Sequence, residues 1–326
     1  MKSQATRVSF PFTYLTHTFL YWISAGTFLV SSIVEEHSRL ICPNFHVEEV
    51  WNVIHKYKPV FLGLTAISAM EMVDLGCPEN IDVKSILTVI VMGSAISKEY
   101  TTKLIKIFPE ADVIRGYGQT EVCGPLAMFR GNDKFHRPLL KEKIDSVGLA
   151  VRGITYKVVD PETNETLGPH QRGELRIKSK LIMNAYYNAD SSESFDEDGW
   201  LKTGDIVYYD EDYCFYVVDR IKEAFKYKGW FIAPAALENE LLNHPAVKQA
   251  LVIGIPKDDG YHPMGVVVLK DNFDVTELEI EKFVELRVPE RHRLRAGVKF
   301  LKSIPSTVTG KVKRTAVRKM VLEGII

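Results

Sequence analysis

The feature that most constrains the fold is an alternation of short apolar runs and amphipathic stretches early in the chain. "ILTVIVMG" (86–93) is rich in β-branched residues and ends at glycine, which predicts a buried strand. "SKEYTTKLIKIF" (97–108) has helical spacing behind a serine cap, and "ADVIRGYG" (111–118) predicts the next strand. Because this is an α/β alternation, we expect a mainly parallel sheet.

From about Asp145 the pattern changes to strands joined by turns. The stretches 155–179 and 213–220 predict a small antiparallel unit, a barrel or a sandwich. After Arg220 we expect a mixed α+β region. Its predicted elements are a helix near 235–243, strands at 249–255 and 265–269, a helix near 276–286 and a basic helix from about Val312.

Composition excludes some classes of protein. At 326 residues the chain should form two or more domains, and a net charge of −1 argues against binding nucleic acid through bulk electrostatics. The cysteines have no C-x-x-C spacing, so a reducing compartment is expected without a disulfide framework or zinc site. They are Cys42, Cys77, Cys123 and Cys214.

One apolar stretch raises the question of a membrane anchor. Residues 8–34 contain no Asp, Glu, Lys or Arg, and 27 residues could span a bilayer. Ser, Thr and His occur throughout the stretch, and Pro11 interrupts its start, which favours a buried strand–helix segment over an anchor. The stretch has no convincing secretory cleavage pattern, and the last three residues are not the Ser-Lys-Leu peroxisomal signal.

"RGYGQTEVCG" (115–124) starts where a predicted strand ends, and ligands of open α/β sheets bind beyond such ends. Gly116 and Gly118 would let the backbone approach a ligand, Thr120 offers a hydroxyl to phosphate, and Glu121 offers an oxygen to Mg²⁺. A glycine turn with a capping threonine and a surface glutamate fits the same residues equally well.

Three further stretches each allow a functional and a structural interpretation. In "GWLKTGD" (199–205), Asp205 could hold ribose hydroxyls or form an Asx turn. The charged stretch 217–241 could be a solvated turn before a helix that starts at Pro234. "IPSTVTGKVKR" (304–314) lacks the glycine spacing of a P-loop, so Lys311 could sit on a surface turn before a basic helix.

The order of these motifs carries a family resemblance. "GYGQTE", "GELRIKS", "GWLKTGD", "DRIKEAFKYKGWFIAPAALE" and "PSTVTGK" together resemble the adenylate-forming superfamily. The chain is most similar to acyl-CoA synthetases, 4-coumarate–CoA ligases and insect luciferase-like proteins. The resemblance implies a remnant of the α/β AMP-binding subdomain (1–142), an antiparallel β subdomain (143–219) and a small mobile C-terminal lid domain (220–326).

The resemblance also implies an activity and its substrates. Such enzymes join a carboxylic acid to ATP, giving an acyl-adenylate and pyrophosphate, and pass the acyl group to a thiol, usually that of coenzyme A. Lys311 matches the adenylation lysine, whose charge would stabilise the developing oxyanion. Lys226 matches a lysine used in the second half-reaction of luciferase-like members, and Glu121 matches the Mg²⁺ ligand.

Further positions follow from the same match. Lys222 matches the hinge between the two domains, and Lys228 and Gly229 lie on the face implied for thioester formation. Trp22 lies in the segment that matches the acyl pocket. The resemblance assigns the remaining positions to the nucleotide site: Gly93, Gly116, Tyr117, Gly118, Thr120, Asp205 and Arg220.

The chain departs from the family pattern in four places. The Ser/Thr/Gly-rich phosphate loop that ends in Pro-Lys-Gly is not found, so we expect a truncated member whose missing part would precede Met1. Trp22 stands where many members have histidine. Phe231 and Ala236 replace a common glutamine and glutamate, and residues 258–265 lack the family's Gly-Glu.

Three hypotheses about function remain open at this point. The first is an acid–thiol ligase for a fatty or aromatic acid, with ATP, Mg²⁺ and coenzyme A. The second is a truncated, non-catalytic relative that binds nucleotide or an acyl ligand, and the third is a luciferase-like monooxygenase. No nucleic-acid or membrane partner is expected, the compartment should be intracellular, cytoplasmic or peroxisomal, and the oligomeric state is not indicated.

Overall fold

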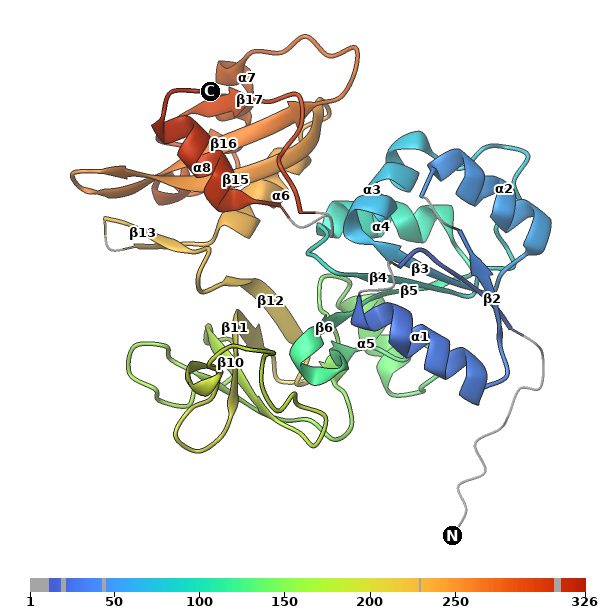
Figure 1. Ribbon diagram of the computed structural model, residues 1–326. Helices are drawn as coiled ribbons and strands as arrows, with labels where there is room; N and C mark the ends of the chain where they lie inside the picture. Colours follow the sequence, from blue (N-terminus) through green and yellow to red (C-terminus); the bar gives the residue numbers. More distant parts are fainter. Residues whose placement is uncertain (1–11, 19–21, 43–44, 229, 308–311) are drawn as a thin grey trace. The chain divides into compact units, whose positions relative to one another are not determined.

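The computed structural model describes residues 12–18, 22–42, 45–228, 230–307 and 312–326 (Figure 1). The chain forms two compact units. The first contains residues 1–155, 178–201 and 210–216, and the second contains residues 156–177, 202–209 and 217–326. Each unit is therefore assembled from segments that are distant in the sequence.

The first unit is built on a five-stranded sheet of order β2-β1-β3-β4-β5. Every neighbouring pair in this sheet is parallel, which confirms the α/β prediction. The strands predicted at 86–93 and 111–118 are β4 and β5. The strand bounds are Thr13–Thr16 (β1), Ser38–Ile41 (β2), Phe61–Thr65 (β3), Thr88–Met92 (β4) and Asp112–Arg115 (β5).

Helices cover both faces of this sheet. Figure 1 shows α2 (Val47–Tyr57), α3 (Ala66–Leu75) and α4 (Lys98–Ile107) on one face and α1 (Ile23–Val34) on the other. The core under α2 and α4 includes Trp51 and Phe108, whose rings stack 5.9 Å apart. Ser97 accepts a hydrogen bond from the Tyr100 N–H and so caps α4, as predicted.

The apolar stretch at 8–34 forms a strand and a helix, but the prediction that it is buried is wrong for much of α1. Leu29, Val30, Ile33 and Val34 are 49 to 72% exposed, whereas Ala25 and Ser32 are buried. The prediction used only the polarity of these side chains. A side chain is buried only where a neighbouring element covers it. Within the described residues, no helix is both long and apolar enough to cross a membrane.

A smaller sheet completes the first unit. Its order is β6-β7-β8, and a short 3₁₀ turn, η1 (Thr120–Val122), joins the first two strands. The other bounds are Tyr117–Gln119 (β6), Gly124–Met128 (β7), Leu149–Ala150 (β8), His136–Glu142 (α5) and Ser192–Ser194 (η2).

A four-stranded sheet of order β12-β11-β10-β9 lies mainly in the second unit. Strands that are consecutive in sequence are neighbours in this sheet, in agreement with the predicted small β unit. In β10, Arg176 Nε lies 2.9 Å from Glu174 Oε2, and both side chains are buried. The bounds are Thr155–Val159 (β9), Gly173–Lys178 (β10), Leu201–Tyr209 (β11) and Phe215–Arg220 (β12).

The remainder of the second unit is a mixed α+β region, as predicted. Strands β15 and β16 form a long antiparallel pair, and a capping box between Thr276 and Glu279 starts α7. The strand bounds are Phe225–Tyr227 (β13), Trp230–Ile232 (β14), Val247–Lys257 (β15), Gly260–Leu269 (β16) and Val298–Phe300 (β17). The helices are Pro234–Leu242 (α6), Glu277–Glu285 (α7), Glu290–His292 (η3) and Arg314–Leu322 (α8).

An ion pair with a buried carboxylate joins the end of α5 to the turn after β11 in the first unit. Lys143 Nζ lies 2.7 Å from Asp210 Oδ2 and also contacts Asp212. Burial opposes the charge of Asp210, but hydrogen bonds from Lys143, the Cys214 N–H and Tyr216 outweigh it and hold the Asp210 pKa below its ordinary value. The carboxylate is therefore charged at neutral pH in the folded state.

We predict that Lys143→Ala lowers the free energy of unfolding by about 3 kcal/mol, because it leaves the buried Asp210 charge without its cation. Lys141→Ala, on the exposed side of α5, is the matched control and should change stability little. Urea denaturation of the two variants and the unchanged chain measures the difference. Equal midpoints for the two variants would contradict a stabilising role for the pair.

Low pH should remove the stabilisation that the Lys143–Asp210 ion pair contributes. Because the pKa of Asp210 is lowered in the folded state, the stabilisation is present above the unfolded carboxyl pKa of about 3.9 and is lost as pH falls through the lower folded value. The stability of the unchanged chain should therefore fall more steeply below about pH 4 than that of Lys143→Ala. Parallel stability–pH curves for the two proteins in this range would argue against a stabilising contribution from the charged Asp210.

Candidate functional site

Two predicted site glycines lie at the same edge of the parallel sheet. Gly93 follows β4 and Gly116 follows β5, and these strands are neighbours. The Gly116 N–H donates to the Val91 carbonyl over 2.9 Å, so the chain stays close to β4 as it leaves β5. Gly93 has φ +92°, a conformation that favours glycine. This carboxyl edge is where open α/β sheets bind ligands.

The segment that carries Tyr117, Thr120 and Glu121 is held by a close contact between two backbones. A Cβ atom at Gly118 would meet the Gly124 carbonyl oxygen and would lie 2.9 Å from the Pro125 Cα in the paired strand β7. Glycine is therefore required here by the hairpin itself, whatever ligand the edge binds. Thr120 is exposed, and Glu121 and Tyr117 are half-buried.

Glu121 is held through both its side chain and its main chain. Its Oε1 accepts a hydrogen bond of 2.7 Å from the Tyr186 hydroxyl, and its carbonyl accepts one of 2.7 Å from the Met183 N–H. The pKa of Tyr186 is raised to about 12, mainly by burial and next by the hydrogen bond to Glu121. The phenol is therefore a donor at neutral pH. Sequence reasoning missed Tyr186, since nothing in "NAYYNAD" distinguishes it from Tyr187.

Glu121 could supply one carboxylate oxygen to a Mg²⁺ ion that arrives with a nucleotide. In the described part of the chain, no group of three or more His, Cys, Asp and Glu side chains could hold a metal ion. Mg²⁺ is commonly held by one or two carboxylates together with substrate phosphates and waters, so a single carboxylate is enough. The Oε2 atom of Glu121 accepts no hydrogen bond from any described residue.

In the second unit, Asp205 and Arg220 come together although they are distant in sequence. Arg220 Nε lies 3.2 Å from Asp205 Oδ1, with the arginine side chain 53% exposed and the aspartate side chain 3% exposed. Asp205 follows Gly204, which has φ +69°, and its N–H donates to the Thr203 hydroxyl. The structure thus places a buried carboxylate beside a half-exposed guanidinium.

The charged stretch 217–241 is not wholly the solvated turn that its composition suggested. Asp219 is 5% exposed and accepts hydrogen bonds from the Arg220 N–H (2.7 Å) and the Ala235 N–H (3.0 Å). Burial, partly offset by these two bonds, raises the pKa of Asp219 to about 6. The carboxylate therefore ties the end of β12 to the first turn of α6, a contact that composition could not indicate.

Arg314 is a second charge, largely but not fully buried, that the sequence analysis did not single out. Its guanidinium contacts Glu238 in α6, lies 3.1 Å from Glu223 Oε2 and donates to the Val252 carbonyl in β15. Burial opposes its charge, but Glu238 and the other nearby acids outweigh this and raise the pKa of Arg314. The start of α8 is thereby joined to three other elements of the second unit.

The other predicted residues do not gather in one place within the units. Lys222 is exposed in the turn after β12, Lys226 pairs with Glu162, and Lys228 lies 3.5 Å from Asp259. Trp22 is half-buried and precedes α1. Lys311 and Gly229 lie outside the described residues, so their predicted roles remain predictions.

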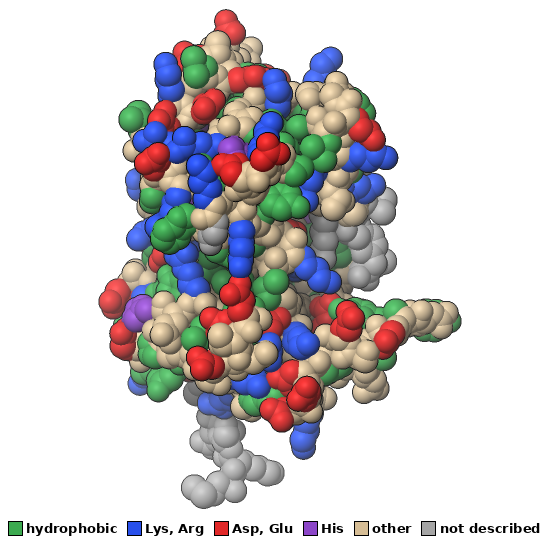
Figure 2. Space-filling model, turned by 90° about the vertical axis from the view of Figure 1, so that its left-hand side faces the viewer, with side chains coloured by type: hydrophobic (Ala, Val, Ile, Leu, Met, Phe, Trp, Pro, Cys, Tyr) green, Lys and Arg blue, Asp and Glu red, His purple; other side chains and the backbone are tan. Residues whose placement is uncertain are grey.

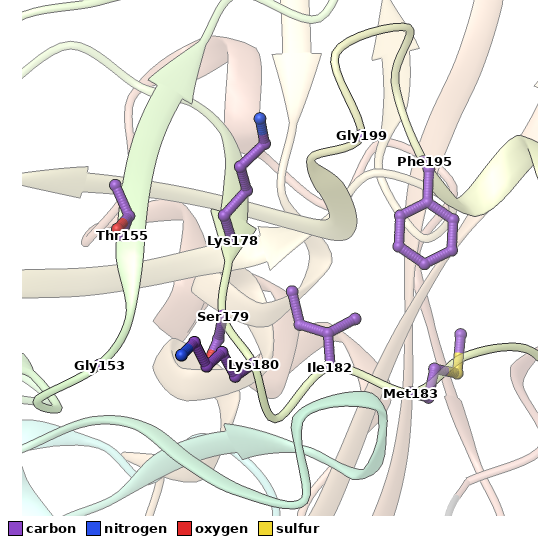
Figure 3. A pocket seen from close by; sticks show the side chains of 9 residues that line it. All are labelled: Gly153, Thr155, Lys178, Ser179, Lys180, Ile182, Met183, Phe195 and Gly199. Atoms are coloured by element: carbon purple, nitrogen blue, oxygen red, sulfur yellow. The ribbon is translucent and has the colours of Figure 1, made fainter.

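A pocket of about 460 Å³ lies in the first unit on the segment that also carries Tyr186 (Figure 3). Lys178 and Lys180 line it together with the apolar side chains of Ile182, Met183 and Phe195. Lys178 Nζ also lies 4.9 Å from the centre of the Trp200 ring. None of the predicted site residues lines this pocket.

Charge on the visible surface is mixed in sign. On the face drawn in Figure 2, acidic and basic side chains are interspersed. The interspersed charges agree with a net charge of −1 for the chain. Such a surface creates no extended field of one sign.

The chain matches two family models in tandem. The model of the AMP-binding enzyme matches residues 2–187, and the model of the AMP-binding enzyme C-terminal domain matches residues 236–311. The first match alone spans more than half of the chain. The chain therefore belongs to the AMP-binding, adenylate-forming enzyme family, as the motif order predicted.

Relatives support the same assignment. The chain is 30% identical over 308 residues to 4-coumarate–CoA ligase-like 9 of Arabidopsis thaliana, covering 94% of this chain and 54% of that protein. It is 39% identical over 235 residues to luciferin 4-monooxygenase of Photinus pyralis, covering 71% of this chain and 41% of that protein. The chain spans about half the length of the curated relatives it matches.

The fold is similar to that of a solved CoA ligase. The o-succinylbenzoate CoA synthetase of Bacillus subtilis, in complex with its acyl-adenylate intermediate, matches with a TM-score of 0.82 and 24% identity over 95% of this chain and 61% of that one. Other structures of that synthetase hold AMP, or ATP and a magnesium ion. At this identity the match shows the shared fold.

We predict that Gly118→Ala destabilises the first unit by about 1–3 kcal/mol, because the new methyl group overlaps the β7 backbone. Gly116→Ala is the matched control, since its Cβ would lie 3.6 Å from Ile90 Cγ2, an ordinary contact. Thermal unfolding of both variants measures the difference. A Gly118→Ala variant as stable as Gly116→Ala would show that the hairpin does not need the glycine.

Proposed function

We propose that the chain carries out, or forms part of an enzyme that carries out, ATP-dependent ligation of a carboxylic acid to coenzyme A. The observation that carries this proposal is the tandem match to both AMP-binding family models, the second of which extends to Lys311. The relative named as a 4-coumarate–CoA ligase-like protein points to an acid–thiol ligase. The acid is either fatty or aromatic.

The proposed reaction has two steps. In the first, a carboxylate oxygen attacks the α-phosphorus of ATP, a new P–O bond forms, and the bond to the β-phosphate oxygen breaks to release pyrophosphate. In the second, the thiol of coenzyme A attacks the acyl carbon, loses its proton and displaces AMP. Both steps build negative charge on oxygen, so cationic groups aimed at those atoms should contribute most to the rate.

Residues of both units receive roles under this proposal. Glu121 would hold Mg²⁺, Thr120 would contact phosphate, and Tyr117 would stack on adenine. Asp205, whose carboxylate is buried beside Arg220, would accept hydrogen bonds from the ribose hydroxyls. The ion pair with Arg220 fixes the position of this carboxylate, which suits recognition of two hydroxyls.

The second step would use other residues. Lys222 would be the hinge, Lys226 would act in the second half-reaction, and Lys228 and Gly229 would face coenzyme A. Lys226 and Lys228 make exposed ion pairs with Glu162 and Asp259, and Lys228 Nζ also lies 5.5 Å from the centre of the Tyr227 ring. Solvent screens exposed ion pairs and leaves them weak, so a substrate could displace either acidic partner at small cost.

A second candidate function follows from the match to a luciferin 4-monooxygenase at 39% identity. That activity would use the same adenylate and then oxygen in place of the thiol. Light emission with added luciferin, ATP and oxygen tests it, and thioester formation without light would reject it. Either activity fits the proposed intracellular compartment, cytoplasm or peroxisome, which is supported by four cysteines that are free in the structure.

We predict that the chain exchanges labelled pyrophosphate into ATP with an acid from a fatty or cinnamic panel, and that Lys311→Ala lowers this rate about 100-fold or more. Loss of the cation would raise the barrier of the first step, while thermal unfolding should stay unchanged. Lys313→Ala, at an exposed position two residues further along the sequence, is the matched control and should keep its activity.

The result of the exchange assay separates the hypotheses. Background exchange by the unchanged chain with every acid would reject the ligase activity of this chain. Binding of ATP without exchange would then support the non-catalytic alternative, in which the chain binds nucleotide without turnover. Equal loss in Lys311→Ala and Lys313→Ala would mean that general charge, rather than one lysine, matters.

A further inference from the structure

We propose that Tyr186 is a positioning residue that holds the Glu121 carboxylate ready for the Mg²⁺ of Mg–ATP. This inference rests on the proposed function, because it assumes that Glu121 meets a metal-bound nucleotide. It adds a residue that lies outside the motifs on which the family resemblance was based.

The geometry around Glu121 carries the proposal. The Tyr186 hydroxyl donates to Oε1 over 2.7 Å, and the Met183 N–H donates to the Glu121 carbonyl over the same distance. Two residues of one segment therefore hold both the side chain and the main chain of Glu121. Oε2 accepts no hydrogen bond from the described residues, so one carboxylate oxygen remains for a ligand.

Tyr186 is itself held in place by its own segment. Its N–H donates to the Ser191 hydroxyl over 2.8 Å, which closes the loop between these residues. Met183 lies three residues before Tyr186, so both anchor points belong to one short stretch. The neighbouring Tyr187 is 93% exposed, whereas Tyr186 is 45% exposed. The contact with Glu121 is thus specific to one of two adjacent tyrosines.

A hydrogen bond of this kind should strengthen metal binding. A glutamate side chain loses rotamer freedom when it is fixed, and a hydrogen-bond donor on one oxygen removes part of that freedom before the metal binds. Removing the hydrogen-bond partner of a metal-ligating carboxylate typically lowers metal affinity about 10- to 100-fold. We therefore expect Tyr186 to affect metal affinity more than the rate at saturating metal.

The test compares Tyr186→Phe with Tyr187→Phe in the full chain. Binding of Mn²⁺–ATP, followed by water proton relaxation, should weaken about 10-fold in Tyr186→Phe and stay unchanged in Tyr187→Phe. Binding of ATP without metal, in the presence of chelator, should be the same in both variants. Thermal unfolding checks that both are folded.

Two further measurements separate positioning from a structural role. In pyrophosphate exchange, Tyr186→Phe should need more Mg²⁺ for half-maximal rate but recover most of the rate at saturation. In a double-mutant cycle with Glu121→Gln, the Tyr186→Phe change should add little further loss, because its partner carboxylate is gone. Recovery at high Mg²⁺ together with this non-additivity would support the proposal.

Other results would overturn it. Equal Mn²⁺–ATP affinity in Tyr186→Phe and Tyr187→Phe would remove the positioning role while leaving the proposed function intact. Equal weakening of metal-free ATP binding would assign Tyr186 to the nucleotide rather than the metal. An unchanged chain that binds ATP but gains no affinity from Mn²⁺ would remove the metal role of Glu121, and with it the reason for Tyr186.

Discussion

The contact between the β6 and β7 backbones at Gly118 determines the course of the segment that carries the candidate site of the first unit. The two chains are so close that a methyl group does not fit between them. Main-chain packing therefore helps to place Tyr117 and η1 at the carboxyl edge of the sheet. Tyr186 and Met183 then hold Glu121 at the end of this hairpin.

In the second unit, a buried and a part-buried charge join several of the elements. Asp219 accepts main-chain hydrogen bonds from both β12 and α6, and Arg314 joins α8 to Glu238 and Glu223. A buried charge is stable only when its hydrogen-bonding partners are in place, so these groups specify how the elements join. Arg220 directly follows Asp219 in the sequence, and its side chain pairs with Asp205.

Secondary structure was predictable here where local signals were strong. β-branched runs predicted β4 and β5, and the serine before α4 and the proline at the start of α6 marked those helix ends. Burial was predicted less well, since the outer side of α1 is apolar yet exposed and Asp219 is charged yet buried. Both outcomes have one cause, because burial depends on neighbouring elements that are distant in sequence.

The sequence by itself determined the family and the α/β class, because motif order and periodicity are properties of the chain alone. It also predicted which residues carry the chemistry. Only the tertiary structure decided which of these residues have partners. The Glu121–Tyr186 and Asp205–Arg220 contacts join residues 65 and 15 positions apart. Such contacts depend on how strands and turns pack, and no local pattern in one sequence encodes that packing.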